Sequence, residues 1–421
     1  MNASKSPDGR SPLLFIFLTV FIDLLGFGIV IPLLPVYSQY FGASEFQLGL
    51  LFACFSGMQL VFAPMWGRLS DRIGRKPVLV GGLIGSAASY ALFAWADTLS
   101  LLFAARLLAG FFGANISSAQ AYIADVTTPE NRAKGMGLLG AAFGLGFTFG
   151  PLLGGLLSGL HADPGQLPPG PGLAAAGLSL AAALFGWLTL HEPARKPGSG
   201  RVFSLESVRE ASREPRIGLM IALNFCNVFA FACFEGMFTR FGLALFPEQF
   251  GQSGPIERAT QAEILRAAPI AGYYLFGIGI VSALIQGGFI RRLVPRYGET
   301  LLALAGPLIL ALAMAGIGLA PNWSVVLAAC ALMPFGFGLS NPSVNSLLSR
   351  AAPADRQGSF LGLNQSASSL ARMSGPPLAG LCFALHPRLP FFLAAGVLLI
   401  AFLIARHYHA RFAHSFPRAG A

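Results

Sequence analysis

Long apolar runs recur along the whole 421-residue chain and constrain its fold more than any other feature. A bilayer core about 30 Å thick is crossed by about 20 apolar residues of helix. Charged residues make up 11% of the chain, whereas about a quarter of an ordinary soluble domain is charged. We therefore predict an all-α membrane protein with twelve transmembrane helices, at residues 13–36, 47–66, 78–96, 101–122, 136–160, 173–190, 217–246, 268–290, 300–320, 323–346, 360–385 and 389–407.

The basic residues predict how these helices are oriented. If the N-terminus is cytoplasmic, most of the 28 Lys and Arg fall in inner loops, and the outer loops hold only Arg258, Arg266 and Arg388. The positive-inside rule then places both termini in the cytoplasm. The net charge of +10 is an orientation signal, so we expect no nucleic-acid partner. We expect a monomeric, multi-pass protein of the cell (inner) membrane, in contact with the lipid bilayer.

An internal repeat divides the chain into two halves. Residues 128–132 (TPENR) recur as 352–356 (APADR), and 150–156 (GPLLGGL) recur as 375–381 (GPPLAGL), at offsets of 224 and 225 residues. A weaker match relates 67–72 to 287–292. Three matches in one order indicate duplication, which is common among secondary transporters. We predict six-helix bundles at 1–190 and 217–421, joined by a cytoplasmic linker at 191–216.

The loop at residues 67–77, GRLSDRIGRKP, is the most specific motif. A glycine permits close helix approach, a proline suits a helix start, and an acid can meet a helix N-terminus. The string resembles the signature loop of the major facilitator superfamily. This resemblance implies two bundles around a central cavity and an inner gate, formed here by Gly67, Asp71, Arg72, Gly74 and Arg75.

The fifth apolar run carries glycines four residues apart, a pattern that allows helix backbones to touch. It resembles the motif of proton-coupled exporters of the superfamily, with its motif positions at Gly146, Gly150, Pro151 and Gly154. The resemblance favours export over uptake.

Asp23 lies about ten residues into the first run, which is about 15 Å deep at 1.5 Å per residue. An ionised acid is costly at that depth, so it must face partners or water, or bind a proton. We interpret Asp23 as the proton carrier; the alternative is a structural acid. The same run resembles the first helix of tetracycline and multidrug proton antiporters.

Two more charged residues are candidates for proton coupling. Arg106, in LLFAARLLAG, resembles the RxxxG motif whose arginine the family links to proton transfer, although it could instead anchor the helix near the outer interface. Glu235 is the one acid in the apolar core of the second half, five residues before Arg240. An ion pair between these two residues and a substrate or proton role for Glu235 both remain open.

Polar side chains within the apolar runs could line a substrate cavity. Arg372 has no acidic neighbour in sequence, and intramembrane arginines usually face a cavity. Each amide could alternatively form an interhelical hydrogen bond. The predicted cavity residues are Gln59, Asn115, Gln120, Asn224, Asn227, Asn345, Gln365 and Arg372.

The resemblance implies a proton-coupled antiporter that exports drugs or small lipophilic molecules, like the tetracycline and multidrug branch. The tetracycline exporters carry further acids in the third and ninth helices; here Ser89 stands near the first site and residues 300–320 hold no acid, which argues against tetracycline itself. The alternative is a carrier of a metabolite, lipid or organic anion. No catalytic motif is present and the five cysteines lack metal-ligand spacing, so we expect no enzyme, cofactor or metal site.

Overall fold

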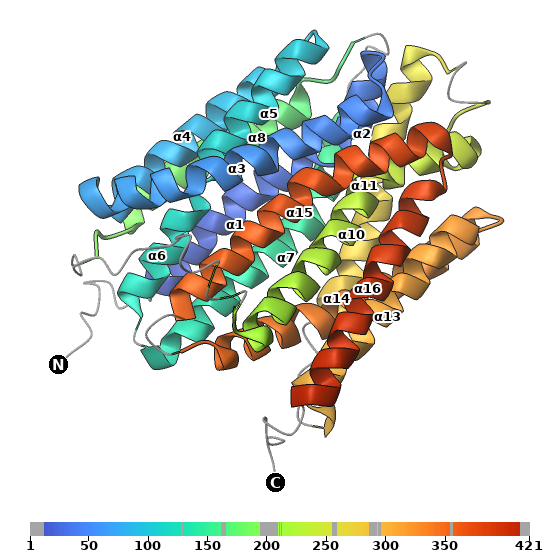
Figure 1. The fold of residues 1–421 in the computed structure, drawn as a ribbon. Coiled ribbons are helices and arrows are strands. Elements are labelled where there is room, and N and C mark those ends of the chain that lie inside the picture. The colour runs from blue at the N-terminus through green and yellow to red at the C-terminus, as the bar shows by residue number, and fades with distance from the viewer. Residues whose placement is uncertain are drawn as a thin grey trace. The chain divides into compact units, whose positions relative to one another are not determined.

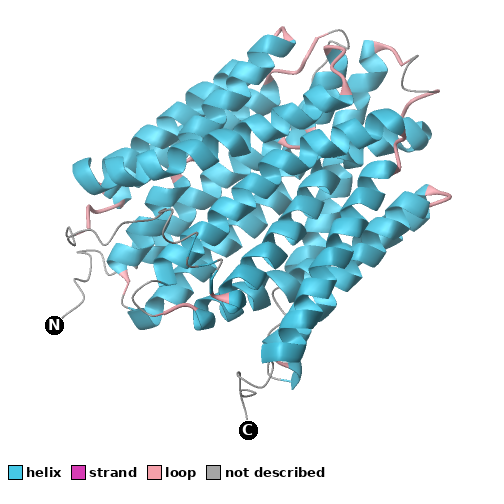
Figure 2. Cartoon of the chain, in the orientation of Figure 1, coloured by secondary structure: helices cyan, strands magenta, loops and turns pink. Residues whose placement is uncertain are grey.

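The computed structural model describes residues 12–127, 129–160, 166–193, 209, 211, 213–254, 259–285, 293, 296–353 and 357–412, without the side chains of 129–134, 357 and 358. Every regular element within these ranges is a helix (Figures 1 and 2). The linker predicted at 191–216 and the weaker repeat at 287–292 lie largely outside the described residues, as do parts of the repeat at 128–132 and 352–356.

The described residues of the first half by sequence form eight helical segments. They are α1 (Pro12–Val30), α2 (Leu33–Tyr40), α3 (Glu45–Ile73), α4 (Arg75–Ala94), α5 (Leu99–Gly113), α6 (Ile116–Val126), α7 (Pro129–Gly159) and α8 (Gly170–Thr189). The predicted continuous first span is broken near Pro32, because proline removes a backbone donor inside a helix. α1 with α2, and α5 with α6, nevertheless each form one stretch long enough to cross a membrane.

The second half by sequence contains α10 (Pro215–Leu245), the short 3₁₀ helix η1 (Pro247–Phe250), α11 (Gln261–Leu284), α13 (Glu299–Leu319), α14 (Trp323–Ala351), α15 (Gln357–Leu385) and α16 (Leu389–Phe412). Side-chain caps begin two of them: Thr260 and Glu263 form a capping box at α11, and Asn322 accepts a hydrogen bond from Val325 N at α14. The turn capped by Thr98 and the one at Asn322 fall in the two short gaps, 97–100 and 321–322, between consecutive predicted runs.

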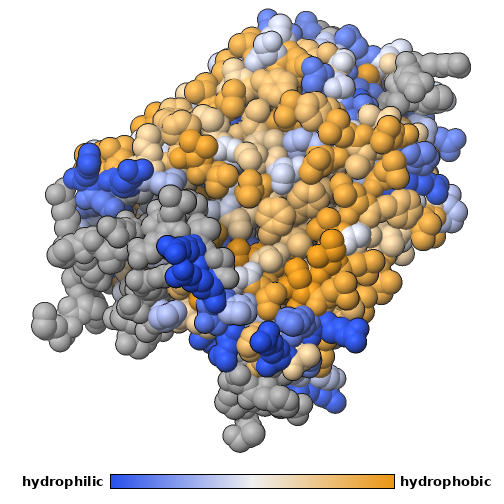
Figure 3. Space-filling view, viewed as in Figure 1, coloured by the Kyte–Doolittle hydropathy of each residue, from blue (hydrophilic) through white to orange (hydrophobic). Residues whose placement is uncertain are grey.

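Eleven described helical stretches are long and apolar enough to cross a membrane. α15 is as long as α14 but is more polar, since it carries Asn364, Gln365 and Arg372. Large apolar side chains such as Leu184 and Leu188 are exposed on the helices, and in Figure 3 hydrophobic residues cover the middle of the helices while hydrophilic ones gather near their ends. The predicted all-α membrane fold is confirmed.

Two compact units are present, and each shares one helix with the other. The first consists of residues 1–41, 57–200 and 265–279, and the second of 42–56, 201–264 and 280–421. In the first, α1 packs on α7 and α8, and α4 packs on α8 and α5. In the second, α10 packs on α15 and α16, and α13 packs on α14 and α16. The start of α3 therefore groups with second-half helices, and part of α11 with first-half helices.

Candidate functional site

Asp23 lies half-buried in the middle of α1. Its Oδ1 accepts a 2.8 Å hydrogen bond from Ser179 Oγ of α8. Asp23 forms no ion pair with any cation in the described part of the chain. The carboxyl group is thus held by a neutral hydroxyl, which can donate to the carboxylate and accept from the protonated acid.

Arg106 of α5 and Tyr90 of α4 belong to the same neighbourhood. The Arg106 guanidinium lies 5.9 Å from the centre of the Phe27 ring, one turn beyond Asp23 on α1. The buried Tyr90 ring approaches α1 at Gly26 and interacts electrostatically with both Asp23 and Arg106. The structure therefore brings two of the predicted proton-coupling residues together.

The glycine motif of α7 fixes how α1 lies. A Cβ at Gly146 would overlap Leu24, one at Gly150 would overlap Gly28, and one at Gly154 would overlap the Ile29 carbonyl. The two backbones thus touch from the residue after Asp23 onward, as the four-residue spacing predicts. Gly140 and Gly144, which precede this series in α7, face open space and take no part in this contact.

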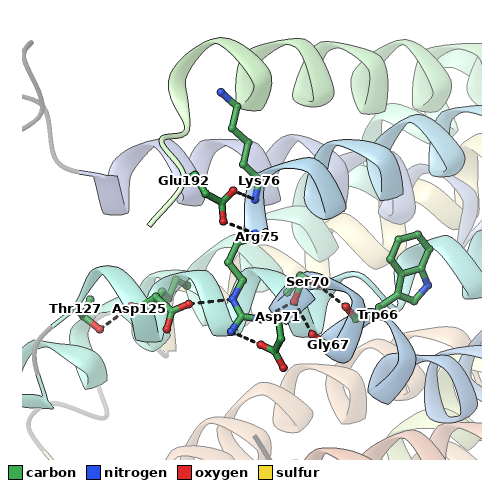
Figure 4. A network of polar contacts seen from close by, with 11 residues as sticks. Trp66, Gly67, Ser70, Asp71, Arg75, Lys76, Asp125, Thr127 and Glu192 are labelled. Carbon is green, nitrogen blue, oxygen red and sulfur yellow. Dashed lines mark hydrogen bonds and ion pairs between the residues drawn. The ribbon is translucent and has the colours of Figure 1, made fainter. Parts of the chain in front are cut away.

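Figure 4 shows a polar cluster around the start of α4. Arg75 binds Asp71 (Nη2 to Oδ1, 2.6 Å) and Asp125 of α6 (Nε to Oδ2, 2.9 Å), and its Nη1 donates to Ser70 Oγ at 2.5 Å. The Arg75 side chain is 16% exposed and Asp125 19%, so these contacts are partly shielded from water. We call Asp71, Arg75, Asp125 and Glu192 the first-half cluster.

Glu192, just after α8, caps α4. Its Oε1 accepts from Arg75 N at 2.6 Å, and its Oε2 accepts from Lys76 N at 2.9 Å (Figure 4). An acid at a helix N-terminus is favoured by the exposed amides and the helix dipole. Gly74, at φ +113°, leaves room for this carboxylate, because a Cβ there would lie 2.8 Å from its Cδ.

Two members of the predicted gate behave differently from Arg75. Arg72 is exposed. The expectation that Gly67 allows close helix approach is wrong for this structure, because a Cβ at that position would meet open space. The Gly67 carbonyl instead accepts a 2.7 Å hydrogen bond from Ser70 Oγ.

Two of the predicted cavity amides of the first unit, Gln59 and Asn115, bond to backbone carbonyls. Gln59 Nε2 donates to Gly113 O at 3.2 Å, and Asn115 Nδ2 donates to Leu79 O at 3.4 Å. Asn115 also fills the space that a side chain at Gly82 would need. Gln120 is half-buried. Gln59 and Asn115 therefore join helices, which was the alternative to a substrate role.

The predicted cavity residues Asn224, Asn227 and Asn345 of the second unit bond to other side chains. Asn224 Nδ2 donates to Ser368 Oγ at 2.8 Å, Asn227 Nδ2 to Ser340 Oγ at 2.7 Å, and Asn364 Nδ2 to Asn345 Oδ1 at 3.1 Å. Asn345 and Gln365 are exposed.

Glu235 and Arg372 interact electrostatically, although α15 offers Arg372 no acid near it in sequence. Arg240 Nη2 binds Glu45 Oε1 at 3.1 Å. This ion pair was not predicted, because Glu45 is distant from Arg240 in sequence and lies in residues 42–56, which pack with the second-half helices.

Comparison with known proteins decides the family. The chain matches the Major Facilitator Superfamily over residues 16–376. It belongs to that superfamily. It is 33% identical to the class C tetracycline resistance protein of Escherichia coli, covering 89% of this chain and 90% of that one. It is 30% identical to multidrug resistance protein 1 of Bacillus subtilis (strain 168), covering 90% and 92%.

A solved structure supports the same fold. The crystal structure of the human organic anion transporter MFSD10 (TETRAN) superposes with a TM-score of 0.69 at 24% identity, covering 95% of this chain and 100% of that one. The superfamily membership and the helical fold together make this chain a multi-pass membrane transporter for a small molecule.

Sequence reasoning missed Ser179, Asp125 and Glu192 as members of these clusters. Ser179 gave no signal, because a serine inside an apolar run is common. Asp125 and Glu192 stand at the ends of the fourth and sixth runs. Both ends lie on the face predicted to carry the 67–77 loop, so shared location was a usable signal.

Proposed function

We propose that this transporter is a proton-coupled antiporter that exports drugs or other small lipophilic molecules by alternating access of its two six-helix halves, 1–190 and 217–421. In this proposal both termini lie in the cytoplasm and the chain works as a monomer in the inner membrane. The observation that carries it is the Asp23 group: an intramembrane carboxyl bonded to Ser179, with Tyr90 and Arg106 in its neighbourhood.

Asp23 would carry the proton. Protonation removes a charge from the membrane interior, where charge is costly, and so changes which access state is favoured. Ser179 can bond to either form of the acid. Arg106 keeps its charge, since a guanidinium is not deprotonated in proteins. Its role would be to favour release of the proton from Asp23.

One acid is sufficient on energetic grounds. Moving one charge through ~100 mV is worth roughly 2.3 kcal/mol, which supports about a fiftyfold substrate ratio. The first-half cluster would hold the inner gate, with Asp71 and Arg75 as its main pair. Glu235 and Arg372 would form a second charged group.

The two relatives support export of drugs, since their names refer to resistance to tetracycline and to multiple drugs. Tetracycline itself is not favoured. Ser89, which stands where the third helix of tetracycline exporters carries an acid, is buried and donates to Gly85 O at 2.8 Å.

A second candidate is export of an organic anion. Arg106 and Arg372 are cationic groups within apolar helices, and a structural neighbour transports organic anions. The two candidates differ in the charge of the cargo that competes with protons.

Reconstituted vesicles test the proposal. Purified transporter in liposomes is given a pH gradient, and movement of ethidium, a lipophilic cation, is compared with that of carboxyfluorescein, an organic anion. We expect gradient-driven ethidium transport that Asp23→Asn reduces at least tenfold without unfolding the protein. Asp97→Asn, at an exposed turn, is the matched control and keeps wild-type transport. Undiminished ethidium transport by Asp23→Asn would refute the role of Asp23 as proton carrier. Transport of carboxyfluorescein but not of ethidium would favour the second candidate function, export of an organic anion.

A further inference from the structure

The first twelve residues of α3 belong to the second unit, although they lie in the first half of the sequence. Residues 42–56 group with α10 and α15, and the remainder of α3 groups with the first unit. If the sequence halves 1–190 and 217–421 move during transport, this end of α3, which is joined to the first half by the chain, must change its contacts with the second-half helices. The contacts made by residues 42–56 therefore bear on the transport cycle.

Backbone contacts hold this end of α3 against α15. A Cβ at Gly49 would overlap the Pro376 carbonyl, and one at Gly380 would overlap the Glu45 carbonyl. These close approaches have counterparts in the first unit, where a Cβ at Gly272 would overlap the Pro151 carbonyl and one at Gly155 would lie against Pro269. The partners on α7 and α15 are the repeated Gly-Pro motifs, 225 residues apart.

The two crossings differ in charge. Glu45 and Pro269 are 224 residues apart, which is the offset of the internal repeat, and they occupy equivalent places opposite Gly380 and Gly155. Pro269 is apolar. Glu45 instead binds Arg240 of α10, with Oε1 and Nη2 3.1 Å apart, and Arg240 also donates to Ala43 O at 3.4 Å.

Because the Glu45–Arg240 ion pair is partly buried, loss of either partner should be costly in free energy. The Arg240 side chain is 10% exposed and that of Glu45 is 27% exposed. Arg240 Nη1 is buried and finds no hydrogen-bond partner in the described part of the chain. Removing Glu45 would thus leave a buried charge uncompensated, which costs more than losing a surface pair. When this end of α3 moves into water, both ions can be hydrated.

We propose that the Glu45–Arg240 pair is the outer latch of the transporter, a positioning contact that holds α3 on α10 and α15 and opens once in each cycle. The inference rests on the proposed alternating access and on the proposed orientation, which puts residue 45 at the outer face. Weakening the latch shifts the protein toward the state that is open to the outside. At the second crossing the equivalent residue is the uncharged Pro269.

Labelling from outside tests the latch without any substrate. Ala53, 7% exposed within residues 42–56, is replaced by cysteine in a background whose native cysteines are removed. A membrane-impermeant maleimide is added to intact cells. We expect Glu45→Gln and Arg240→Gln to raise the labelling rate about tenfold, equivalent to about 1.4 kcal/mol. Glu248→Gln, an exposed acid of η1, leaves the rate unchanged.

The exchanged pair Glu45→Arg with Arg240→Glu separates a latch from general damage. It should return the labelling rate toward that of wild type, with thermal stability in detergent as the folding check. Equal rates in wild type and Glu45→Gln would overturn the latch, as would an exchanged pair that labels as fast as the single variants. Because Glu45 is the more exposed partner, Glu45→Gln answers the question even if Arg240→Gln does not fold. A wild-type protein that transports neither ethidium nor carboxyfluorescein would refute the proposed antiport. The labelling experiment would still test the latch, because it needs no substrate.

Discussion

Two helix starts, 224 residues apart, are built alike but carry opposite charges. α4 begins after Gly74, with φ +113°, and α13 begins after Gly298, with φ +76°. The next residue pairs with a helix of the same unit in both cases. Arg75 binds Asp125 at 2.9 Å, and Glu299 Oε1 binds Arg350 Nη2 at 3.3 Å. The two halves thus both place an ion-paired residue directly after the glycine, but it is a base in the first half and an acid in the second.

The two clusters differ in how many interactions meet at the central residue. Arg75 also binds Asp71 and Ser70, while Glu192 caps the helix that it begins. Glu299 adds one hydrogen bond, from Ser346 at 2.7 Å, and its partner Arg350 is 51% exposed. We call Glu299, Ser346 and Arg350 the second-half cluster. The comparison indicates that the first-half cluster contributes more stability and is the stronger candidate for the gate.

Neutralising the central residue of each cluster, Arg75 or Glu299, should give the largest difference in stability between the two clusters. Arg75→Gln leaves Asp71 and Asp125 without their common partner, and hydrogen bonds to charged groups are worth about 1.5–3 kcal/mol, so we expect a loss of about 2–3 kcal/mol. Glu299→Gln should cost about 1 kcal/mol, since its ion pair is half-exposed. Thermal unfolding in detergent and vesicle transport measure both. Equal losses in the two variants would remove the distinction between the clusters.

Exchanging the two charges of an ion pair should give a smaller difference in stability between the two clusters. Glu299→Arg with Arg350→Glu should recover stability to within about 0.5 kcal/mol of wild type, because a partly exposed pair is worth at most about 1 kcal/mol. Arg75→Glu with Asp125→Arg should recover less, since an acid at position 75 would face Asp71. The same unfolding assay applies, with each single variant as its control. Full recovery in the first-half cluster would mean that Asp71 contributes nothing.

Substitution of the glycines before the two helix starts, Gly74 and Gly298, should give the smallest difference in stability. Gly298→Ala meets open space, so its only cost is the backbone strain of a Cβ at φ +76° and ψ 155°, about 1–3 kcal/mol. Gly74→Ala should cost about 1 kcal/mol more, because its methyl group would displace the Glu192 carboxylate. Combining Gly74→Ala with Glu192→Ala removes the collision. The added cost of Gly74→Ala over Gly298→Ala should then become smaller. A Gly74→Ala variant no less stable than Gly298→Ala would contradict the capping role of Glu192.

The helices could be predicted from the sequence because apolar length is a local property. The turns at residues 97–100 and 321–322 were found for the same reason, since their caps are local too. The break at Pro32 was missed, because the apolar run continues through it. The span predicted at 360–385 corresponds to α15, Gln357–Leu385, although its amides and Arg372 interrupt an otherwise apolar helix.

The site was predictable only as single residues. Asp23 and Arg106 stand out as charges in apolar runs, but nothing near them in sequence reveals Ser179 or Tyr90. The Glu45–Arg240 pair was missed because residues 42–56, in the first half of the sequence, belong to the second unit, and Glu235 was the acid nearer to Arg240 along the chain. Pairing of this kind depends on tertiary packing, which local pattern does not encode.

Proton release on binding tests the central claim most directly. Purified transporter in weakly buffered detergent solution is mixed, at several pH values between about 5 and 8, with whichever probe the wild-type protein exports. If Asp23 exchanges a proton for substrate, wild type releases protons in proportion to binding, Asp97→Asn does the same, and Asp23→Asn binds the probe without releasing any. Equal proton release by Asp23→Asn and wild type would contradict the account.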